Sequence, residues 1–200
     1  MRIACLHLPG FPLQVAVRAT PHLMGTPFAV VAGGKIVAAS RRAADAGVTA
    51  GMSAAQARAA TVELSLVPAG RLEEAMRSLG EAALELSMTV DAESPGALYA
   101  LVPPRAAGFG DKLARLAQRM GFVGRVGIAD NRFTAWAATQ TTPHARVRQV
   151  PAGGSAAFLE PLPLSLLPLD PDVRKMLGHL GVATLGDFAA LPPPSVGRGG

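Results

Sequence analysis

The sequence predicts an α+β fold in which amphipathic helices cover a sheet of short strands. Short apolar segments that suit strands alternate with helix-like segments from residue 64 onward. Apolar residues recur at helical spacing over residues 72–86 and again over residues 109–120. A further apolar run over residues 2–8 suits a core strand and is stopped by Pro9-Gly10. Long helices that alternate with short strands are typical of helices packed on a sheet.

Local signals predict the individual elements. Residues 28–32 and 36–38 suit two strands joined at Gly33-Gly34, a typical hairpin turn. Residues 43–60 are rich in alanine and interrupted by glycine, which favours two short helices. Further strands are expected at 64–67, 97–102, 124–129 and 146–150, and further helices at 72–86, 109–120 and 131–140. With the N-terminal strand added, this order is compatible with a ferredoxin-like sheet.

The C-terminal part differs in composition from the rest of the chain. Leucine and proline dominate residues 159–171, which predicts a semi-rigid connector. Two short helices are expected after it, at 173–180 and 184–191, separated by Gly181. The proline- and glycine-rich end over residues 192–200 does not resemble a domain terminus and suggests a chain that is cut short.

Composition places the chain among globular proteins. Apolar residues make up 50% of the sequence and charged residues 16%, which argues against disorder. No apolar run is long enough to span a membrane, and the apolar start before His7 is too short for a signal peptide. Because Cys5 is the only cysteine, an internal disulfide and a cysteine-based zinc site are excluded. A cytoplasmic protein is therefore expected.

The charges are unevenly distributed along a chain whose net charge is +5. Residues 1–44 contain no acid, residues 59–99 hold seven acids, and residues 105–148 carry eight basic residues against two acids. This layout suits a surface that follows a phosphate backbone, and it suits an arginine-rich solvated face equally well. Charge alone does not choose between these interpretations.

Three segments of the chain carry motifs in a defined order. They are Gly47-Val48 with Gly51-Met52, then Gly-Ile-Ala-Asp-Asn-Arg-Phe-Thr-Ala at residues 127–135, then Leu-Gly-Val-Ala-Thr-Leu-Gly-Asp-Phe at residues 180–188. Together they resemble the fingers, palm and thumb motifs of the Y-family (UmuC/DinB-like) DNA polymerases. The resemblance covers essentially the whole chain, and no single motif is specific alone.

This resemblance implies a division into domains. It implies a ferredoxin-like palm over residues 1–15 and 70–158 and fingers over residues 16–69. A proline-rich connector over 159–171 would lead to a partial, helix-hairpin-helix-like thumb over 172–200. The little finger and the C-terminal tail of the family would then be absent from this chain.

The family joins nucleotides with two Mg²⁺ ions that are held by acidic residues on two palm strands. On the first strand the acid position falls at His7, followed by Leu8 and Pro9, and none of these supplies an anionic oxygen. Because the first acid of the chain is Asp45, no shift of register along this strand restores one. The resemblance therefore implies a protein without a bound metal or other cofactor.

The second palm strand carries an Asp-Glu dyad in the family. Alignment through Ala97-Leu98-Tyr99 places Pro95 and Gly96 at these positions. Asp91 and Glu93 lie just upstream and would share a face in an extended strand, where they could hold Mg²⁺. A polar turn before the strand is the other interpretation of these two acids.

The residues that contact the triphosphate in the family are also replaced. A tyrosine and an arginine at the start of the fingers helix correspond to positions near Arg41 and Ala44. The lysine that reaches the phosphates corresponds to Trp136, whose indole carries no charge. The resemblance therefore implies that the nucleotide site is lost together with the metal site.

DNA binding is the property that remains, and it is expected to be weak and independent of sequence. In helix-hairpin-helix modules, glycine turns point backbone N–H groups at phosphates. The first such turn, at 169–173, has two acids and no glycine, whereas Gly181 and Gly186 with Arg198 nearby suit phosphate better. The candidates for phosphate contact are Lys112, Arg115, Arg119, Arg125, Arg146, Arg148, Arg174, Lys175 and Gly181.

Losses of this kind resemble the ImuB branch of the family. The resemblance implies a non-catalytic adaptor in SOS-induced, error-prone translesion synthesis, located in the cytoplasm at the nucleoid and not in a membrane. Its partners would be the sliding clamp, an ImuA-like RecA homologue and an error-prone C-family polymerase, mostly bound through segments absent here. An active translesion polymerase with an atypical Mg²⁺ site on Asp91 and Glu93 stays open as the alternative.

Overall fold

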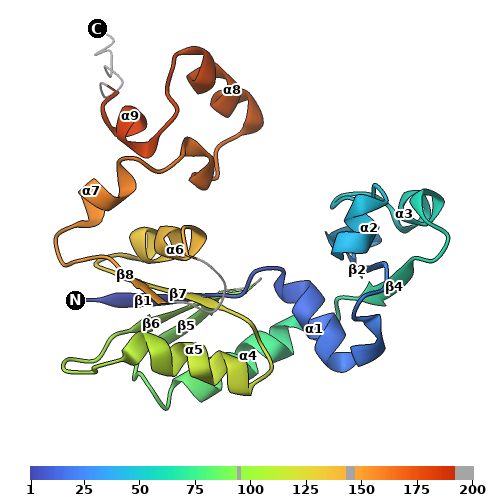
Figure 1. Ribbon diagram of the computed structural model, residues 1–200, viewed down its shortest axis with the longest axis horizontal. Coiled ribbons are helices and arrows are strands. Elements are labelled where there is room, and N and C mark those ends of the chain that lie inside the picture. The colour runs from blue at the N-terminus through green and yellow to red at the C-terminus, as the bar shows by residue number, and fades with distance from the viewer. Residues whose placement is uncertain (94–95, 143–146, 192–200) are drawn as a thin grey trace, which may run out of the picture.

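The computed structural model describes residues 1–93, 96–142 and 147–191. Its centre is a five-stranded sheet with the strand order β5-β6-β1-β7-β8 (Figure 1). The strands are β1 (Ile3–His7), β5 (Val90–Glu93), β6 (Ala97–Leu101), β7 (Arg125–Ala129) and β8 (Val147–Gln149). Strand β1 lies between β6 and β7 and runs antiparallel to both.

Two long helices complete a ferredoxin-like arrangement. Helix α4 (Leu72–Ala83) joins β1 to β5 through the intervening chain, and α5 (Phe109–Arg119) joins β6 to β7. The order β1-α4-β5-β6-α5-β7, with β1 and β6 in the middle, is the βαββαβ topology of ferredoxin-like folds. Strand β8 extends this sheet by pairing parallel to β7. The prediction of an α+β fold with a ferredoxin-like sheet is confirmed.

The two faces of this sheet are covered by different helices. Helices α4 and α5 lie on one face, and α6 (Arg132–Gln140) lies on the other (Figure 1). Successive side chains of β1 point to opposite faces of the sheet. Leu6 is therefore buried in the core under α4 and α5, whereas Cys5 is buried under α6. The larger core belongs to the α4 and α5 face, where Phe11 and Phe122 pack with ring centroids 5.7 Å apart.

A second, three-stranded sheet lies beside the first. It has the order β3-β2-β4 and consists of β2 (Phe28–Ala32), β3 (Lys35–Ala39) and β4 (Ser65–Pro68). Helices α2 (Arg41–Asp45) and α3 (Ala54–Ala60) accompany it. Gly33 and Gly34 both have positive φ, as the expected hairpin turn requires. The chain reaches this sheet through α1 (Phe11–Ala19) and the short helix η1 (Pro21–Leu23), which the sequence did not predict.

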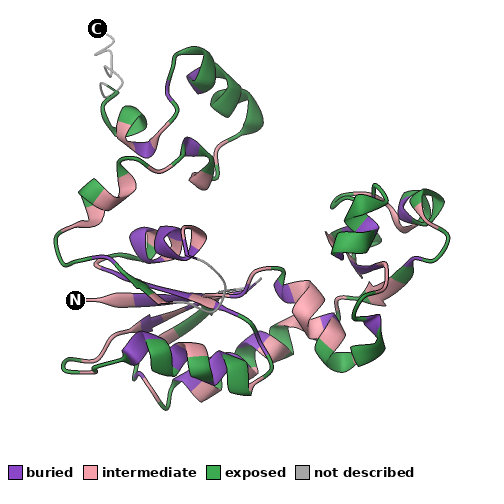
Figure 2. Ribbon diagram, viewed as in Figure 1, coloured by how far each residue is buried: buried purple, intermediate pink, exposed green. Residues whose placement is uncertain are grey.

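The C-terminal part forms a small helical unit. It contains α7 (Ser155–Leu159), η2 (Leu164–Leu166), α8 (Pro171–His179) and α9 (Leu185–Ala189). In Figure 2 the ribbon of α8 is exposed along most of its length. Within the residues that the structure describes, no helix has the length and apolarity needed to cross a membrane.

Residues 159–171, expected to form a semi-rigid connector, also contribute to the core of the helical unit. Leu164 is only 4% exposed and packs with Leu177, Val182 and Leu185 in the core of the helical unit. The Leu164 N–H donates a 2.9 Å hydrogen bond to the Ala183 carbonyl. Leucines spaced between prolines in this segment are therefore core residues, held in place by backbone pairing to the following turn.

Candidate functional site

His7 ends strand β1 on the face covered by α6. It pairs with Ala97 of β6 on one side and with Arg125 of β7 on the other. The pKa of His7 lies below its usual value, first because burial disfavours the charged ring and second because the Arg125 guanidinium repels it. The Gln140 side-chain nitrogen lies 3.3 Å from Nδ1 of His7. Because an amide nitrogen donates, this contact fits the tautomer in which Nδ1 accepts and Nε2 carries the proton.

Gly96 lies where the resemblance places the second acid of the dyad, and its backbone excludes a side chain. Its φ of +102° is in the region that side chains disfavour. A Cβ at this position would lie 2.6 Å from Cβ of Phe11 and 3.0 Å from the Leu8 carbonyl oxygen. The Gly96 carbonyl accepts a 2.8 Å hydrogen bond from the Leu8 N–H, which fixes this close approach.

The other positions matched to carboxylates are equally unsuited to a cation. Leu8 is buried in the α4 and α5 core, and Pro9 leads into α1, where its carbonyl accepts a hydrogen bond from the Gln14 amide at 2.9 Å. Pro95 lies outside the described residues. Among the described residues, no group of three His, Cys, Asp or Glu side chains is arranged to hold a metal ion. Mg²⁺ prefers hard oxygen ligands, so an imidazole and a glycine do not fit it.

Asp91 and Glu93 lie in strand β5, so the interpretation of a polar turn is wrong. Asp91 is opposite Tyr99, and Glu93 is opposite Ala97. The Asp91 carboxylate forms an ion pair with Arg132 of α6, with Oδ2 and Nη2 2.5 Å apart. The Arg132 guanidinium also lies over the Tyr99 ring, 4.3 Å from its centroid. In this structure the charge partner of Asp91 is Arg132.

The residues matched to the triphosphate site lie on separate parts of the fold. Arg41 and Ala44 are on α2 against the three-stranded sheet, and the Arg41 side chain is 94% exposed in an ion pair with Asp45 at 4.0 Å. Trp136 is on α6 over the five-stranded sheet, half-buried, with its ring 5.9 Å from that of Phe133. Arg41 and Trp136 therefore lie on helices that pack against different sheets.

A cavity of about 570 Å³ opens beside His7, between the α6 face of the sheet and the C-terminal unit. Its lining combines aromatic side chains with two nitrogen donors from His7 and Arg174. The aromatic residues are Tyr99, Phe133 and Trp136. Sequence reasoning named Trp136 and Arg174 for other reasons and missed Phe133, although aromatic residues three apart on one helix face were a usable signal.

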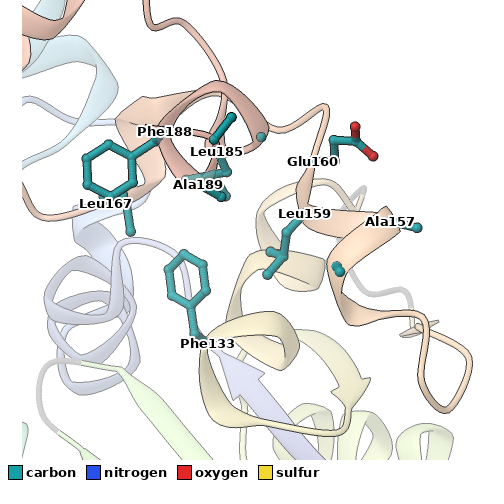
Figure 3. A pocket seen from close by; sticks show the side chains of 11 residues that line it. Phe133, Ala157, Leu159, Glu160, Leu167, Leu185, Phe188 and Ala189 are labelled. Carbon is teal, nitrogen blue, oxygen red and sulfur yellow. The ribbon is translucent and has the colours of Figure 1, made fainter. Parts of the chain in front are cut away.

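A second, more apolar cavity of about 650 Å³ lies on the other side of Phe133. Figure 3 shows the Phe133 ring pointing toward Leu167 and Phe188, with Leu159 beside it. Phe133 also packs against the core of the C-terminal unit. Phe133 of α6 and Leu167 of the C-terminal unit therefore line both cavities, and Phe133 supports the unit above it.

The segment from Gly127 to Asn131, which is part of the palm motif, positions the N-terminus of α6. The Asn131 side chain caps α6 by accepting a 2.8 Å hydrogen bond from the Thr134 N–H. Asp130 pairs with Arg2 at 2.8 Å and accepts a hydrogen bond from the Gly153 N–H at 2.7 Å. These contacts hold the pKa of Asp130 below its usual value, the Arg2 hydrogen bond first. The motif thus fixes the start of the helix that carries the two aromatic rings.

The structure divides the basic candidates between two faces. Lys112, Arg115 and Arg119 are exposed on α5, which lies on the sheet face opposite α6 (Figure 1). Arg174 and Lys175 are exposed on α8, in the unit on the α6 side. The two groups do not form one surface.

The remaining candidates for phosphate contact differ in how exposed they are. Arg125 is half-buried and donates to the Thr139 carbonyl at 3.5 Å. Arg148 is exposed on β8, with its guanidinium 5.1 Å from the centroid of the Phe158 ring. Gly181 has a positive φ in the exposed turn after α8. Arg146 and Arg198 lie outside the described residues.

Curated proteins similar to this chain are DNA polymerases. DNA polymerase IV of Dehalococcoides mccartyi (strain CBDB1) is 37% identical over 79 residues, which cover 39% of this chain and 20% of the relative. DNA polymerase IV 2 of Mesorhizobium japonicum (strain LMG 29417 / CECT 9101 / MAFF 303099) is 28% identical over 195 residues, covering 91% of this chain and 46% of the relative. The chain therefore spans less than half the length of these relatives.

Solved structures of Y-family polymerases share the fold. An insertion ternary complex of Dbh DNA polymerase superposes with a TM-score of 0.79 at 20% identity, over 96% of this chain and 61% of that chain. DinB from Sulfolobus solfataricus superposes with a TM-score of 0.78 at 19% identity and the same coverage. Residues 6–140, more than half of the sequence, match the impB/mucB/samB family. The chain belongs to the impB/mucB/samB family and has the fold of the Y-family DNA polymerases.

Proposed function

We propose that this protein is a non-catalytic member of its family, which binds DNA and acts as an adaptor in an error-prone translesion synthesis complex. One observation carries the proposal. Where the resemblance places two metal-binding acids, the chain has a neutral histidine, His7, and a glycine, Gly96, whose backbone leaves no room for a side chain.

The electrostatics of this site support the proposal. Two-metal catalysis needs several anionic oxygens that neutralise the cations and the triphosphate. Beside His7 lies the cationic Arg125, and the Asp91 carboxylate is paired with Arg132. A divalent cation placed here would meet positive charge and an imidazole instead of the hard oxygen ligands that Mg²⁺ prefers. The same residues disfavour the alternative of an active polymerase with its metal on Asp91 and Glu93.

The partners follow from the resemblance to the ImuB branch. We propose the sliding clamp, an ImuA-like RecA homologue and an error-prone C-family polymerase, in a complex located at the nucleoid. An adaptor needs a fold that recognises the primer and template without performing the reaction. The five-stranded sheet is complete, and His7 and Gly96 occupy the positions where the resemblance places metal-binding acids. Such a sheet is suited to that role.

Primer extension by the full encoded protein tests the proposal. With Mg²⁺ or with Mn²⁺ we expect no incorporation on a primer and template that the protein binds by fluorescence anisotropy. The DNA polymerase IV of Dehalococcoides mccartyi serves as the positive control. Incorporation that disappears in the variant Asp91→Ala plus Glu93→Ala would refute the proposal and establish the atypical metal site.

A further inference from the structure

A groove of about 540 Å³ lies against α1, the helix that connects the five-stranded sheet to the three-stranded sheet (Figure 1). One wall consists of α1 and η1, and the other is the segment before β7. The apolar residues that line this α1 groove include Leu13, Val17, Met24, Phe28 and Val123. We infer that the α1 groove binds an acidic segment of a partner protein, which inserts an apolar side chain. None of the described residues that line it also lines the cavity beside His7, so the inference does not depend on whether the protein is catalytic.

The α1 groove exposes apolar side chains to water. Met24 is 74% exposed and Val123 is 53% exposed, one on each wall. Among the described residues that line the groove, only Gln14 and Arg18 have polar side chains. Exposed apolar residues that gather in one place are typical of a surface that contacts another protein. A DNA duplex would present phosphates to this surface and no apolar side chain, so a protein is the partner that fits.

Hydrogen bonds from Gln14 hold the two walls of the groove together. Its Nε2 donates to the Val123 carbonyl at 2.9 Å, and its Oε1 accepts from the Val123 N–H at 2.7 Å. The same Nε2 also donates to the Pro9 carbonyl at 2.9 Å. Both bonds to Val123 use its backbone, so the valine side chain is held at the surface and remains available for contact. A surface that is already ordered loses less conformational entropy when a partner binds.

The charge of the groove indicates an acidic partner. Arg18 is exposed, and its guanidinium lies 5.0 Å from the centroid of the Phe122 ring. Arg18 also lines a smaller cavity of about 240 Å³, to which α4 and the residue before it contribute Arg71 and one acid, Glu74. Within the part of the chain that the structure describes, neither arginine forms an ion pair. Two arginines against one acid favour carboxylates on the partner, because complementary charges steer association and disfavour wrong partners.

Selection from a peptide library tests what the groove binds. The full encoded protein is immobilised, and random dodecapeptides displayed on phage are selected on it, with the Val123→Asp variant used for counter-selection. We expect enriched peptides that combine several acidic residues with at least one large apolar residue. Enrichment of peptides without acids, or no enrichment on the wild type relative to the variant, would overturn the inference.

Variants of the apolar lining give the first quantitative check. Fluorescence anisotropy of an enriched peptide should show binding about tenfold weaker in Val123→Asp, as for a residue at the centre of an interface. Met24→Asp, on the opposite wall, should have a similar effect. The matched control is Val62→Asp, which changes a valine that is 98% exposed and does not line the groove, and it should leave binding unchanged. Unchanged affinity in both Val123→Asp and Met24→Asp would contradict the inference.

A change of charge gives the second check. Arg18→Glu should weaken binding of the acidic peptide about tenfold, and a peptide with lysine in place of its acids should restore binding to this variant. Arg58→Glu, which changes an exposed arginine of α3, serves as the control and should bind the acidic peptide as the wild type does. Equal affinity of the wild type and Arg18→Glu for the acidic peptide would refute the acidic partner.

Two other occupants are separated by the same variants. A dimer of the wild type in sedimentation equilibrium that dissociates in Val123→Asp would assign the groove to a second copy of this chain. Displacement of the bound peptide by a DNA duplex would assign it to nucleic acid. Either result would overturn the inference.

Discussion

His7 lies where the resemblance places an acid, and its surroundings decide which chemistry the side chain supports. An aspartate here would be stabilised by a cation, whereas the imidazole is stabilised in its neutral form by burial and by the nearby Arg125. Gln140 fits the neutral ring, because its amide donates to an unprotonated Nδ1. The surroundings of His7 therefore match a neutral ring and not a metal ligand set.

This environment predicts a dependence of stability on pH. The folded pKa of His7 lies below the usual value of 6.5, so the unfolded chain takes up this proton more readily as the pH falls. The stability linked to His7 is fully present above pH 6.5 and is lost as the pH falls below that value toward the folded pKa. Urea unfolding between about pH 7 and pH 5 measures it.

A comparison of variants isolates the contribution of this histidine. In His7→Gln the loss of stability on acidification should be smaller than in the wild type, because the glutamine does not titrate. His22→Gln, which changes an exposed histidine on η1, serves as the matched control and should keep the wild-type behaviour. An identical pH dependence in His7→Gln and wild type would contradict the neutral assignment.

Helix α6 carries Phe133 and Trp136, and its closeness to β7 depends on one glycine. A Cβ on Gly127 would lie 1.9 Å from the Ala135 carbonyl oxygen, so helix and strand would have to separate. We expect Gly127→Ala to destabilise the fold by about 1–3 kcal/mol or more, as overpacking does. Thermal or urea unfolding of the variant gives the value.

The matched control for this prediction is another glycine-to-alanine change in a helix. Gly178 lies inside α8, and a Cβ there meets no atom within 4 Å. Gly178→Ala should therefore stabilise α8 by about 0.5–1 kcal/mol, because alanine loses less backbone entropy in a helix. A Gly127→Ala protein as stable as the Gly178→Ala protein would show that α6 does not depend on close packing against β7.

Elements with a strong local signal were predictable, and a strand whose residues disfavour an extended backbone was not. Strand β5 was missed because Asp91 and Glu93 are unfavourable in strands, and only pairing with β6 makes the segment extended. Helix α1 was missed because Pro9, Gly10 and Pro12 resemble a loop. In the structure Gly10 takes a positive φ before the helix, and Pro12 fits its first turn.

The features of the candidate site also differ in whether the sequence could predict them. The absence of acids before Asp45 is a property of composition, so the sequence excludes a carboxylate on the first strand in any register. The closed backbone at Gly96 needs its φ value and the position of Phe11, which the sequence does not contain. The cavity joins Tyr99, Trp136 and Arg174 from three distant segments. Packing of α6 on the sheet brings Tyr99 and Trp136 together, and packing of the C-terminal unit on Phe133 adds Arg174.

At the scale of the whole molecule, five of the basic candidates lie on two separate surfaces. The α5 surface consists of Lys112, Arg115 and Arg119, and the α8 surface consists of Arg174 and Lys175. They lie on opposite sides of the five-stranded sheet (Figure 1), so a duplex that contacts one does not reach the other. The α8 surface is next to the His7 cavity, which Arg174 also lines.

We therefore expect DNA to bind at the α8 surface, and the salt dependence of affinity tests this. Removal of one cation that neutralises a phosphate lowers the slope of log K against log salt by about 0.9 for B-DNA. Arg174→Ala plus Lys175→Ala should weaken binding and reduce the slope by about 2, one unit for each cation. The variant with Lys112, Arg115 and Arg119 all changed to alanine should keep both the affinity and the slope. If instead the α5 variant has the reduced slope and the α8 variant keeps the wild-type slope, DNA binds on the face covered by α4 and α5, and the His7 cavity faces away from it.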